Sequence, residues 1–339
     1  MMRPHVVHLV CSAAFAGVER YVLSAARQQA DRGLRVSVIG GDPAVFPAAL
    51  ESIGARWLPG ATRAAAARAL RSIPDAGIIN SHMTDADIVA GLVARRGASL
   101  VSTRHFAARR GSTAPNRVIA GAVASRVRAQ IAISHYVAAH VEGDSEVIHT
   151  GVEDREPSAA PRERLVLVAQ RLESEKHTAD VLHAWARTSA RGAGWRLAIA
   201  GDGSERPALE RLAQEVGVAA TVDFLGFVRD VSALYDRASL LVAPTPREGL
   251  GLSVVEAMAH ALPVVASDAG GHRETVGGVA GAALFPPEDA AALAARIDAL
   301  ASDGDRRSAY GEALRARQRA EFTFRRQTDR TIDLYERLL

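Results

Sequence analysis

The sequence predicts an α/β protein with two doubly wound domains, each a parallel sheet with helices on both faces. Short apolar runs alternate with longer helical stretches along most of the chain. The runs are continuously apolar, which is typical of parallel strands buried on both faces. A polar, proline-containing segment at Val152–Arg164 interrupts the alternation and has the composition of a linker. The length of 339 residues suits two domains of moderate size.

The first alternation begins near the N-terminus and predicts βαβ units. Its expected strands are His5–Cys11, Arg35–Gly40, Ile78–Ser81, Ser99–Thr103 and Ala129–Ser134. Its expected helices are Val18–Arg32, Asp85–Arg96 and Ala114–Val127. We therefore expect the first doubly wound domain over residues 1–154.

The second alternation follows the linker. Its expected strands are Leu165–Ala169, Arg196–Ala200, Thr221–Leu225, Leu240–Ala243, Pro263–Ala266 and Ala282–Phe285. Its expected helices are Ala179–Thr188, Arg206–Val216, Val231–Arg237, Ser253–Ala259 and Ala290–Ala301, with further helix from Asp305 to Leu339. We expect the second domain over residues 155–322. A break at Phe322-Thr323-Phe324 would let a helix at about 323–339 pack back on the first domain.

Charge and cysteine content exclude several classes of protein. The formal net charge is only +3 and the arginines are spread along the chain, so a dedicated nucleic-acid binder is not expected. Cys11 is the only cysteine, which predicts a reducing compartment and no intrachain disulfide. Neither a signal peptide nor a membrane-spanning run is evident. We expect a cytoplasmic protein. Its oligomeric state and a peripheral association with the inner face of the membrane are left open.

A glycine-rich segment with two carboxylates follows the expected strand Leu240–Ala243. It reads Glu248-Gly249-Leu250-Gly251-Leu252-Ser253-Val254-Val255-Glu256 and leads into a helix. The glycines permit a ligand to approach the backbone, and the helix N-terminus suits an anion such as a diphosphate. Glu256, in about the first helical turn, can accept both hydroxyls of a ribose, and Glu248 can accept a sugar hydroxyl. The alternative is an ordinary helix N-terminus with acidic residues.

Two cations follow the expected strand Leu165–Ala169, in the segment Gln170-Arg171-Leu172-Glu173-Ser174-Glu175-Lys176. Arg171 and Lys176 can neutralise the charge on a leaving nucleoside diphosphate, and two fixed cations can replace Mg²⁺ in that task. We therefore expect no metal ion and no other cofactor. The alternative is a loop in which these cations form ion pairs with its own glutamates.

With these two segments in place, the chain resembles the retaining glycosyltransferases of family 4, which have the GT-B fold. The resemblance covers essentially the whole chain and is strongest from Leu165 to Glu274. It implies that Glu256 binds the ribose, Glu248 the donor sugar, and Arg171 and Lys176 the phosphates. The backbone of Gly249, Leu250, Gly251 and Leu252 would face the donor. Phe227 and Val228, in Phe224-Leu225-Gly226-Phe227-Val228, match the place where the nucleobase binds.

The N-terminal half resembles the family less closely. Gly17, in Ala16-Gly17-Val18-Glu19, matches a loop that approaches the diphosphate and the transferred sugar. His105 matches a histidine near the reacting sugar, and a structural histidine is the alternative. His82 matches a histidine on the acceptor side. Arg104 begins a cluster of arginines that either binds an anionic acceptor or forms a solvated face.

Several positions depart from the family pattern. His149-Thr150-Gly151-Val152 stands where Pro-Asn-Gly-Val is common. Ala16 and Gln170 stand where glycine is common, and so does His177. Arg273 stands where proline is frequent, in Gly270-Gly271-His272-Arg273-Glu274. None of these departures removes a charged donor-binding group, but they prevent any transfer of sugar specificity.

The resemblance implies retaining transfer of a hexose-type sugar from a UDP- or GDP-sugar to a hydroxyl of a glycan, lipid-linked or small-molecule acceptor. No Asp/Glu pair suits a double displacement. In this family a phosphate oxygen of the leaving group is thought to act as base, after domain closure has brought Gly17 and His105 toward the sugar. A GT-B nucleotide-sugar epimerase and a catalytically silent binding protein stay open as alternatives. A dinucleotide dehydrogenase is disfavoured, because the first strand does not lead into Gly-x-Gly-x-x-Gly.

Overall fold

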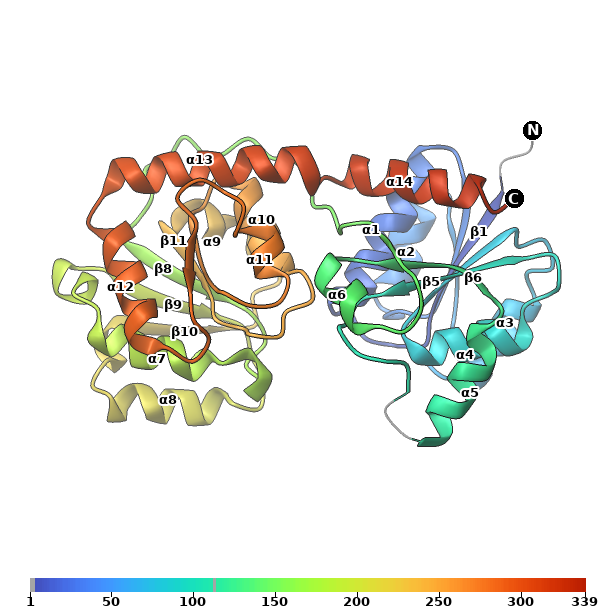
Figure 1. Ribbon diagram of the computed structural model, residues 1–339, viewed down its shortest axis with the longest axis horizontal. Coiled ribbons are helices and arrows are strands. Elements are labelled where there is room, and N and C mark those ends of the chain that lie inside the picture. The colour runs from blue at the N-terminus through green and yellow to red at the C-terminus, as the bar shows by residue number, and fades with distance from the viewer. Residues whose placement is uncertain (1–3, 112–113) are drawn as a thin grey trace. The chain divides into compact units, whose positions relative to one another are not determined.

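The computed structural model describes residues 4–111 and 114–339. The chain divides into two compact units. Unit 1 comprises the residues up to Gly151 together with Phe324–Leu339, and unit 2 comprises Val152–Thr323. Each unit has a wholly parallel sheet with helices packed on it (Figure 1), so the predicted fold class is confirmed.

Within the described residues, the sheet of unit 1 has seven strands in the order β3-β2-β1-β4-β5-β6-β7. The strands are β1 (His5–Val10), β2 (Arg35–Ile39), β3 (Arg56–Leu58), β4 (Ile78–His82), β5 (Ser99–Arg104), β6 (Val127–Ala132) and β7 (Glu146–Val147). The helices are α1 (Gly17–Asp31), α2 (Phe46–Glu51), α3 (Arg63–Arg71), α4 (Thr84–Val93), α5 (Ala114–Ala124), α6 (His135–His140) and α14 (Phe324–Glu336).

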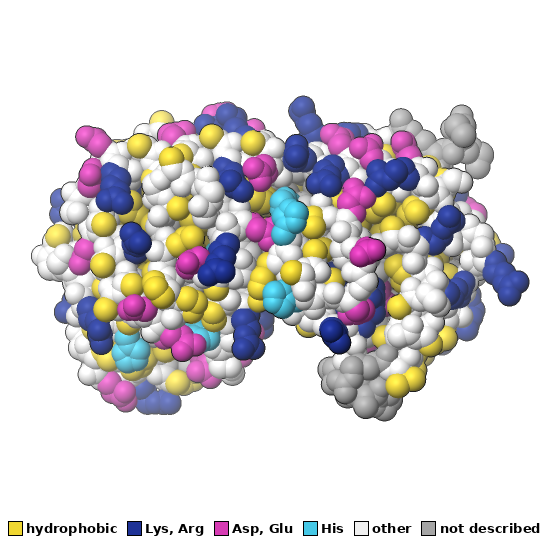
Figure 2. All heavy atoms as spheres, in the orientation of Figure 1, with side chains coloured by type: hydrophobic (Ala, Val, Ile, Leu, Met, Phe, Trp, Pro, Cys, Tyr) yellow, Lys and Arg dark blue, Asp and Glu magenta, His cyan; other side chains and the backbone are white. Residues whose placement is uncertain are grey.

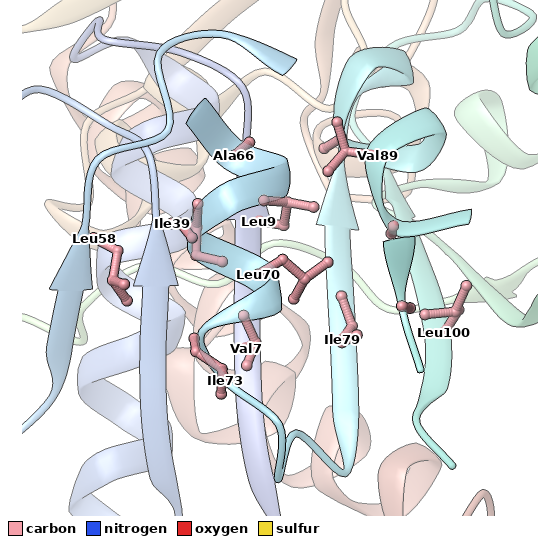
Figure 3. Close-up of a cluster of buried hydrophobic side chains, with 14 residues drawn as sticks. Val7, Leu9, Ile39, Leu58, Ala66, Leu70, Ile73, Ile79, Val89 and Leu100 are labelled. Carbon is pink, nitrogen blue, oxygen red and sulfur yellow. The ribbon is translucent and has the colours of Figure 1, made fainter. Parts of the chain in front are cut away.

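The two faces of this sheet have separate apolar clusters, because side chains alternate along each strand. On one face Val7 and Leu9 of β1 pack with residues of α3 and α4, as Figure 3 shows. On the other face Val6 packs with Leu334 and Tyr335 of α14. Helix α14 lies beside α1 on this second face (Figure 1).

The second face changes character toward the carboxyl ends of its strands. Four fully buried polar side chains lie on this face, each two or four positions after one of its apolar residues: His8, Asn80, His82 and Thr103. Polar side chains can be buried at little cost only when they are hydrogen-bonded. These four side chains are hydrogen-bonded in two pairs, His8 with His82 and Asn80 with Thr103, and form a polar layer that is described with the site below.

Unit 2 repeats the topology with six strands among the described residues, in the order β10-β9-β8-β11-β12-β13. The strands are β8 (Leu165–Ala169), β9 (Arg196–Ala200), β10 (Val222–Gly226), β11 (Leu240–Ala243), β12 (Val264–Ser267) and β13 (Ala283–Phe285). The helices are α7 (Thr178–Arg187), α8 (Arg206–Glu215), α9 (Ser232–Arg237), α10 (Leu252–Ala259), α11 (His272–Thr275), α12 (Ala290–Ala301) and α13 (Gly304–Glu321). Short 3₁₀ turns lie at Ser174–Lys176, Ala190–Ala193 and Ala219–Thr221.

The predicted strands and helices are present with ends shifted by up to three residues, and the structure adds elements that the prediction lacked. The main omission is the stretch with α2, β3 and α3, where β3 has only three residues and α3 is rich in alanine. Alanine gives little hydrophobic contrast, so periodicity is weak there. The expected linker is also anchored to unit 2: the half-buried Arg162 donates to the carbonyls of Tyr235, Ala238 and His260.

Charges of both signs are mixed on the face of the molecule that Figure 2 shows. Lys and Arg side chains are interspersed there with Asp and Glu side chains. Across the described residues, no helix combines the length and the apolar character needed to span a bilayer.

A buried ion pair lies on the α4 side of unit 1. The Arg110 Nε is 2.5 Å from Asp87 Oδ2, and the two side chains are 5% and 1% exposed. Ser81 and Ser102 also donate hydroxyl hydrogen bonds to the Asp87 carboxylate. Glu142 accepts from Arg110 at 2.6 Å. Because a buried charge without its partner is costly, this pair constrains the segment that follows β5.

Replacing Arg110 by methionine should lower the free energy of unfolding by about 3–5 kcal/mol, because the Asp87 carboxylate stays buried without its cation. Arg109→Met is the matched control: this neighbouring side chain is exposed, and its loss should change stability by less than about 0.5 kcal/mol. Urea denaturation followed by circular dichroism measures both. Equal unfolding midpoints for the two variants would contradict the assignment.

Candidate functional site

In unit 2 the strand order reverses between β8 and β11, which are hydrogen-bonded neighbours. In open parallel sheets this switch point opens a crevice at the carboxyl ends of the strands, where ligands bind. The two segments singled out from the sequence follow these two strands. The structure therefore brings Lys176 and Glu248 to the same edge of one sheet.

Lys176 and Glu248 form a hydrogen-bonded ion pair. The Lys176 Nζ lies 2.7 Å from Glu248 Oε2, and the side chains are 17% and 25% exposed. Burial raises the pKa of Glu248, and the charge and hydrogen bond of Lys176 lower it. With smaller contributions from His272 and the Gly249 N–H, the pKa lies below its ordinary value. The site thus presents an ionised carboxylate and an ammonium side by side at neutral pH.

Two glycines hold the glycine-rich segment in place. The Gly271 N–H donates to the Glu248 carbonyl at 2.8 Å. A Cβ at Gly271 would lie 2.5 Å from the Gly249 carbonyl oxygen, and one at Gly270 would lie 2.6 Å from that of Glu248. No side chain fits in that space. Backbone therefore packs directly on backbone, and Gly270 and Gly271 are structural parts of the site to which the sequence analysis assigned no role.

His272 lies against the other end of the segment. The φ of Gly251 is +89°, which favours glycine, and a Cβ there would lie only 3.1 Å from His272 Nε2. Ser267 Oγ donates to the Thr245 carbonyl at 2.7 Å and accepts from Nδ1 of His272 at 3.0 Å. Burial lowers the pKa of His272 to about 4, so the ring is neutral with Nε2 unprotonated.

Two of the departures from the family pattern lie next to Lys176. The Gln170 amide donates to the Lys176 carbonyl at 2.9 Å and accepts from Thr245 Oγ1 at 3.1 Å. It therefore connects the segments after β8 and β11, which glycine cannot do. His177 has φ +53°, a left-handed conformation that favours glycine. Its Nδ1 lies 3.2 Å from Asp180 Oδ2.

Glu256 lies one turn into α10. The helix begins at Leu252, one residue earlier than predicted, so Glu256 opens the second turn instead of lying in the first. Tyr235 of α9 is 1% exposed and its hydroxyl donates to Glu256 Oε2 at 3.0 Å. Tyr235 thus orients the carboxylate, a role that the sequence analysis missed.

The remaining predicted residues of unit 2 lie nearer the surface. Arg171 forms an exposed pair with Glu175 at 3.0 Å, and such pairs contribute little to stability. Phe227 is 70% exposed just beyond β10, and Val228 next to it is half-buried. Leu250 is buried, so only its backbone can face a ligand.

In unit 1, Gly17 opens α1. The Glu19 carboxylate caps this helix by accepting from the Ala16 N–H at 3.0 Å. A Cβ at Gly17 would meet nothing within 4 Å, and its φ lies outside the left-handed region. Nothing within the described residues therefore requires glycine here, which is expected where a ligand approaches the backbone.

His82 and His105 belong to a row of buried imidazoles in the polar layer. The His82 Nδ1 lies 3.0 Å from His105 Nε2, and its own Nε2 lies 3.0 Å from His8 Nδ1. The ring of Tyr21, one helical turn after Gly17, packs edge-on against His105 with centroids 4.8 Å apart. His82 is 0% exposed, so in this structure it can act on a ligand only through His105.

Arg104 is engaged within unit 1. It is 7% exposed and bonds Glu142 at 3.0 Å, Gln130 at 3.2 Å and the Ala108 carbonyl at 2.7 Å. This geometry favours a structural role beside Arg110, and contact with an acceptor stays a prediction.

One feature of the sequence singles out Lys176. Lys and Arg together number 41, and Lys176 is the only lysine among them. An ammonium is a compact point charge, whereas a guanidinium is a broad planar fork, and the two are not interchangeable at a crowded site. Lys176 is therefore the one position where the chain presents an ammonium side chain.

Two family models match the chain. Glycosyltransferase Family 4 matches residues 15–156, and Glycosyl transferases group 1 matches residues 152–317. The chain is 34% identical over 176 residues to the GDP-mannose-dependent alpha-(1-6)-phosphatidylinositol dimannoside mannosyltransferase of Mycobacterium tuberculosis, covering 51% of this chain and 44% of that protein. It is 35% identical over 123 residues to the lipopolysaccharide core biosynthesis mannosyltransferase LpcC of Rhizobium leguminosarum, covering 36% and 35%. The chain thus spans less than half the length of the curated relatives it matches.

Solved structures match over nearly the full length. Anabaena Alr3699/HepE in complex with UDP-glucose has a TM-score of 0.82 at 21% identity, covering 98% of this chain and 99% of that one. A glycosyltransferase from Rickettsia africae has a TM-score of 0.81 at 17% identity, covering 99% and 98%. At these identities the likeness establishes the fold. With both halves matched by family models and the whole chain matched in fold, this protein belongs to the group 1 glycosyltransferases of family 4 and has the GT-B fold.

Proposed function

We propose that this chain is a retaining glycosyltransferase that moves a hexose-type sugar from a UDP- or GDP-sugar to an acceptor hydroxyl without a metal ion. The observation that supports this most is the 2.7 Å pair of Lys176 and Glu248 at the switch point of unit 2. A cation, a carboxylate and the N-terminus of α10 lie together there. The cation and the helix N-terminus can each bind a phosphate group, and the carboxylate can accept a hydrogen bond from a sugar hydroxyl.

In this proposal Lys176 and the N–H groups at the start of α10 bind the diphosphate. Arg171 leaves its exposed contact with Glu175 and adds a second charge at little cost. Glu248 accepts a hydroxyl of the donor sugar. Fixed positive groups stabilise the charge that develops as the diphosphate departs, which makes a divalent cation unnecessary.

The nucleoside would lie along the neighbouring strands. Glu256, oriented by Tyr235, accepts the ribose hydroxyls. The exposed Phe227 ring and the adjacent Val228 backbone contact the base. Gly17 and His105 of unit 1 would act on the sugar, as the family resemblance implies.

The transfer breaks the bond between the anomeric carbon and the phosphate oxygen and forms one to the acceptor oxygen on the same face. The acceptor proton passes to a phosphate oxygen of the leaving nucleoside diphosphate. No protein carboxylate is needed as nucleophile, which agrees with the ion pairing of Glu248. Retention of the anomeric configuration follows.

The relatives support nucleotide-sugars as the class of donor without indicating which one this chain uses. One matching structure holds UDP-glucose and one matching relative is GDP-mannose-dependent. The named relatives act in lipopolysaccharide core and phosphatidylinositol mannoside synthesis. We therefore propose a glycan or lipid-linked acceptor in polysaccharide biosynthesis, with a small-molecule acceptor as the second candidate. Such acceptors suit a cytoplasmic enzyme that associates peripherally with the membrane.

The test begins with thermal unfolding in the presence of individual UDP- and GDP-sugars, since a ligand that binds the native state raises the melting temperature. Stabilising donors are then incubated with acceptors, with and without EDTA, and the anomeric product is identified by NMR. Transfer with retention and no effect of EDTA supports the proposal. An inverted product, dependence on a divalent ion, epimerisation without acceptor, or binding without turnover would each overturn a named part of it.

Lys176→Ala should lower turnover by about 10²–10³-fold, because the charge on the departing diphosphate loses its cation. Lys176→Arg should recover only part of this, because a guanidinium does not fit the space of an ammonium. Glu175→Gln, at an exposed neighbouring position, serves as control and should keep wild-type turnover. Steady-state release of nucleoside diphosphate measures all three, and full activity of Lys176→Ala would refute the assignment.

Gly17→Ala should preserve the fold and weaken donor use. Alanine favours the helix by up to about 1 kcal/mol, and the space beside Gly17 is open, so unfolding should not become easier. The added methyl would occupy space expected for the donor, so KM for the donor should rise about tenfold or more. Gly121→Ala, a helical glycine with equally open surroundings, should leave KM unchanged. An unaltered KM in Gly17→Ala would place the donor elsewhere.

A further inference from the structure

A row of hydrogen-bonded side chains in unit 1 ends at His105. Gln29 Oε1 lies 2.9 Å from His8 Nε2, His8 Nδ1 lies 3.0 Å from His82 Nε2, and His82 Nδ1 lies 3.0 Å from His105 Nε2. We call these four residues the imidazole row. The first three are at most 1% exposed and His105 is 9% exposed. The reaction proposed above uses His105 and leaves the rest of the row unexplained.

Each imidazole of the row carries a single proton at neutral pH. Burial is the main cause in all three: it lowers the pKa of His8 to about 4, that of His105 to about 3, and that of His82 well below its ordinary value. A neutral imidazole donates from one nitrogen and accepts at the other. Two ring-to-ring hydrogen bonds among three neutral rings therefore require all rings to donate in the same direction. The group at the closed end of the row decides which direction that is.

Gln29 is the group at the closed end. Its Oε1, which can only accept, faces Nε2 of His8 at 2.9 Å. His8 then donates to Gln29, His82 donates to His8, and His105 donates to His82, in each case from Nε2.

The open end of the row is Nδ1 of His105. Among the described residues this atom has no hydrogen-bond partner, and His105, at 9% exposed, is the most exposed member of the row. With the proton of His105 on Nε2, Nδ1 offers a lone pair. A lone pair accepts a hydrogen bond from a hydroxyl and repels a phosphate oxygen.

We infer that Gln29, His8 and His82 are positioning residues that hold His105 as a hydrogen-bond acceptor for a sugar hydroxyl. The choice of a sugar hydroxyl rests on the proposed function, whereas the direction of the row does not. The row makes this end of unit 1 select the polyol part of a substrate over its phosphates.

The direction of the row is tested on the free, full-length chain by NMR. Ring ¹⁵N and ¹³Cδ2 shifts distinguish the Nε2–H from the Nδ1–H tautomer, and His105→Asn identifies the His105 signals by their loss. The wild-type chain should show His105 as the Nε2–H tautomer. An Nδ1–H tautomer, which a reversed Gln29 amide would produce, overturns the inference whether or not the chain transfers sugar.

Two substitutions of Gln29 separate positioning from packing. Gln29→Glu keeps an acceptor facing His8 and should keep the tautomer. Gln29→Met keeps the volume, removes the acceptor, and should give a mixture of tautomers. With a donor that the enzyme uses, Gln29→Met should lower kcat/KM by about tenfold, the size of one neutral hydrogen bond, and Gln29→Glu should restore most of it.

Thr103→Val is the matched control. Thr103 donates to Asn80 Oδ1 at 2.8 Å in the same buried layer but outside the row. It should destabilise the chain to a similar degree while leaving the His105 tautomer as in wild type. If Thr103→Val and Gln29→Met shift the tautomer and kcat/KM alike, the row has only a structural role. If no donor is used but the tautomers follow this pattern, the proposed function fails and the direction of the row stands.

Discussion

The ion pair of Lys176 and Glu248 is the contact on which the rest of the candidate site depends. Its charges are partly buried at the switch point of unit 2, where a misplaced partner would leave a desolvated charge. Gln170 fixes the lysine side by bonding the Lys176 carbonyl, and the Gly271 N–H fixes the Glu248 carbonyl. Three segments that are distant in sequence, those after β8, β11 and β12, thus converge on one pair, and the glycines are there because these segments must approach to backbone contact.

The two units share a strand order but place different chemical groups at the switch point of the sheet. Unit 2 places a cation, carboxylates and a helix N-terminus at its switch point, a set that suits phosphates and polyols. Unit 1 places neutral imidazoles beside its own switch between β1 and β4. Burial keeps those rings uncharged. The C-terminal helix α14 belongs to unit 1 and completes its polar layer through Tyr335.

Much of the fold and part of the site could be predicted, for identifiable reasons. Continuous apolar runs and the segment from Glu248 to Glu256 are local patterns, so they predicted the parallel sheets and the candidate donor site. Tyr235 could not be assigned because its contact with Glu256 joins two helices. His272 was visible as part of a glycine-containing motif, but its place against Gly251 depends on packing. A count of lysines would have strengthened the case for Lys176.

The sequence by itself determined the order of most strands and helices, the family to which the chain belongs, and which charged residues follow the strands at the switch point. Periodicity and short motifs record these properties because they depend on neighbours along the chain. Only the tertiary structure decided that Lys176 pairs with Glu248 and that Arg104 pairs with Glu142. It also decided that His82 is fully buried and hydrogen-bonded to His105. Those outcomes depend on burial and on contacts between distant segments, which leave no local pattern in the sequence.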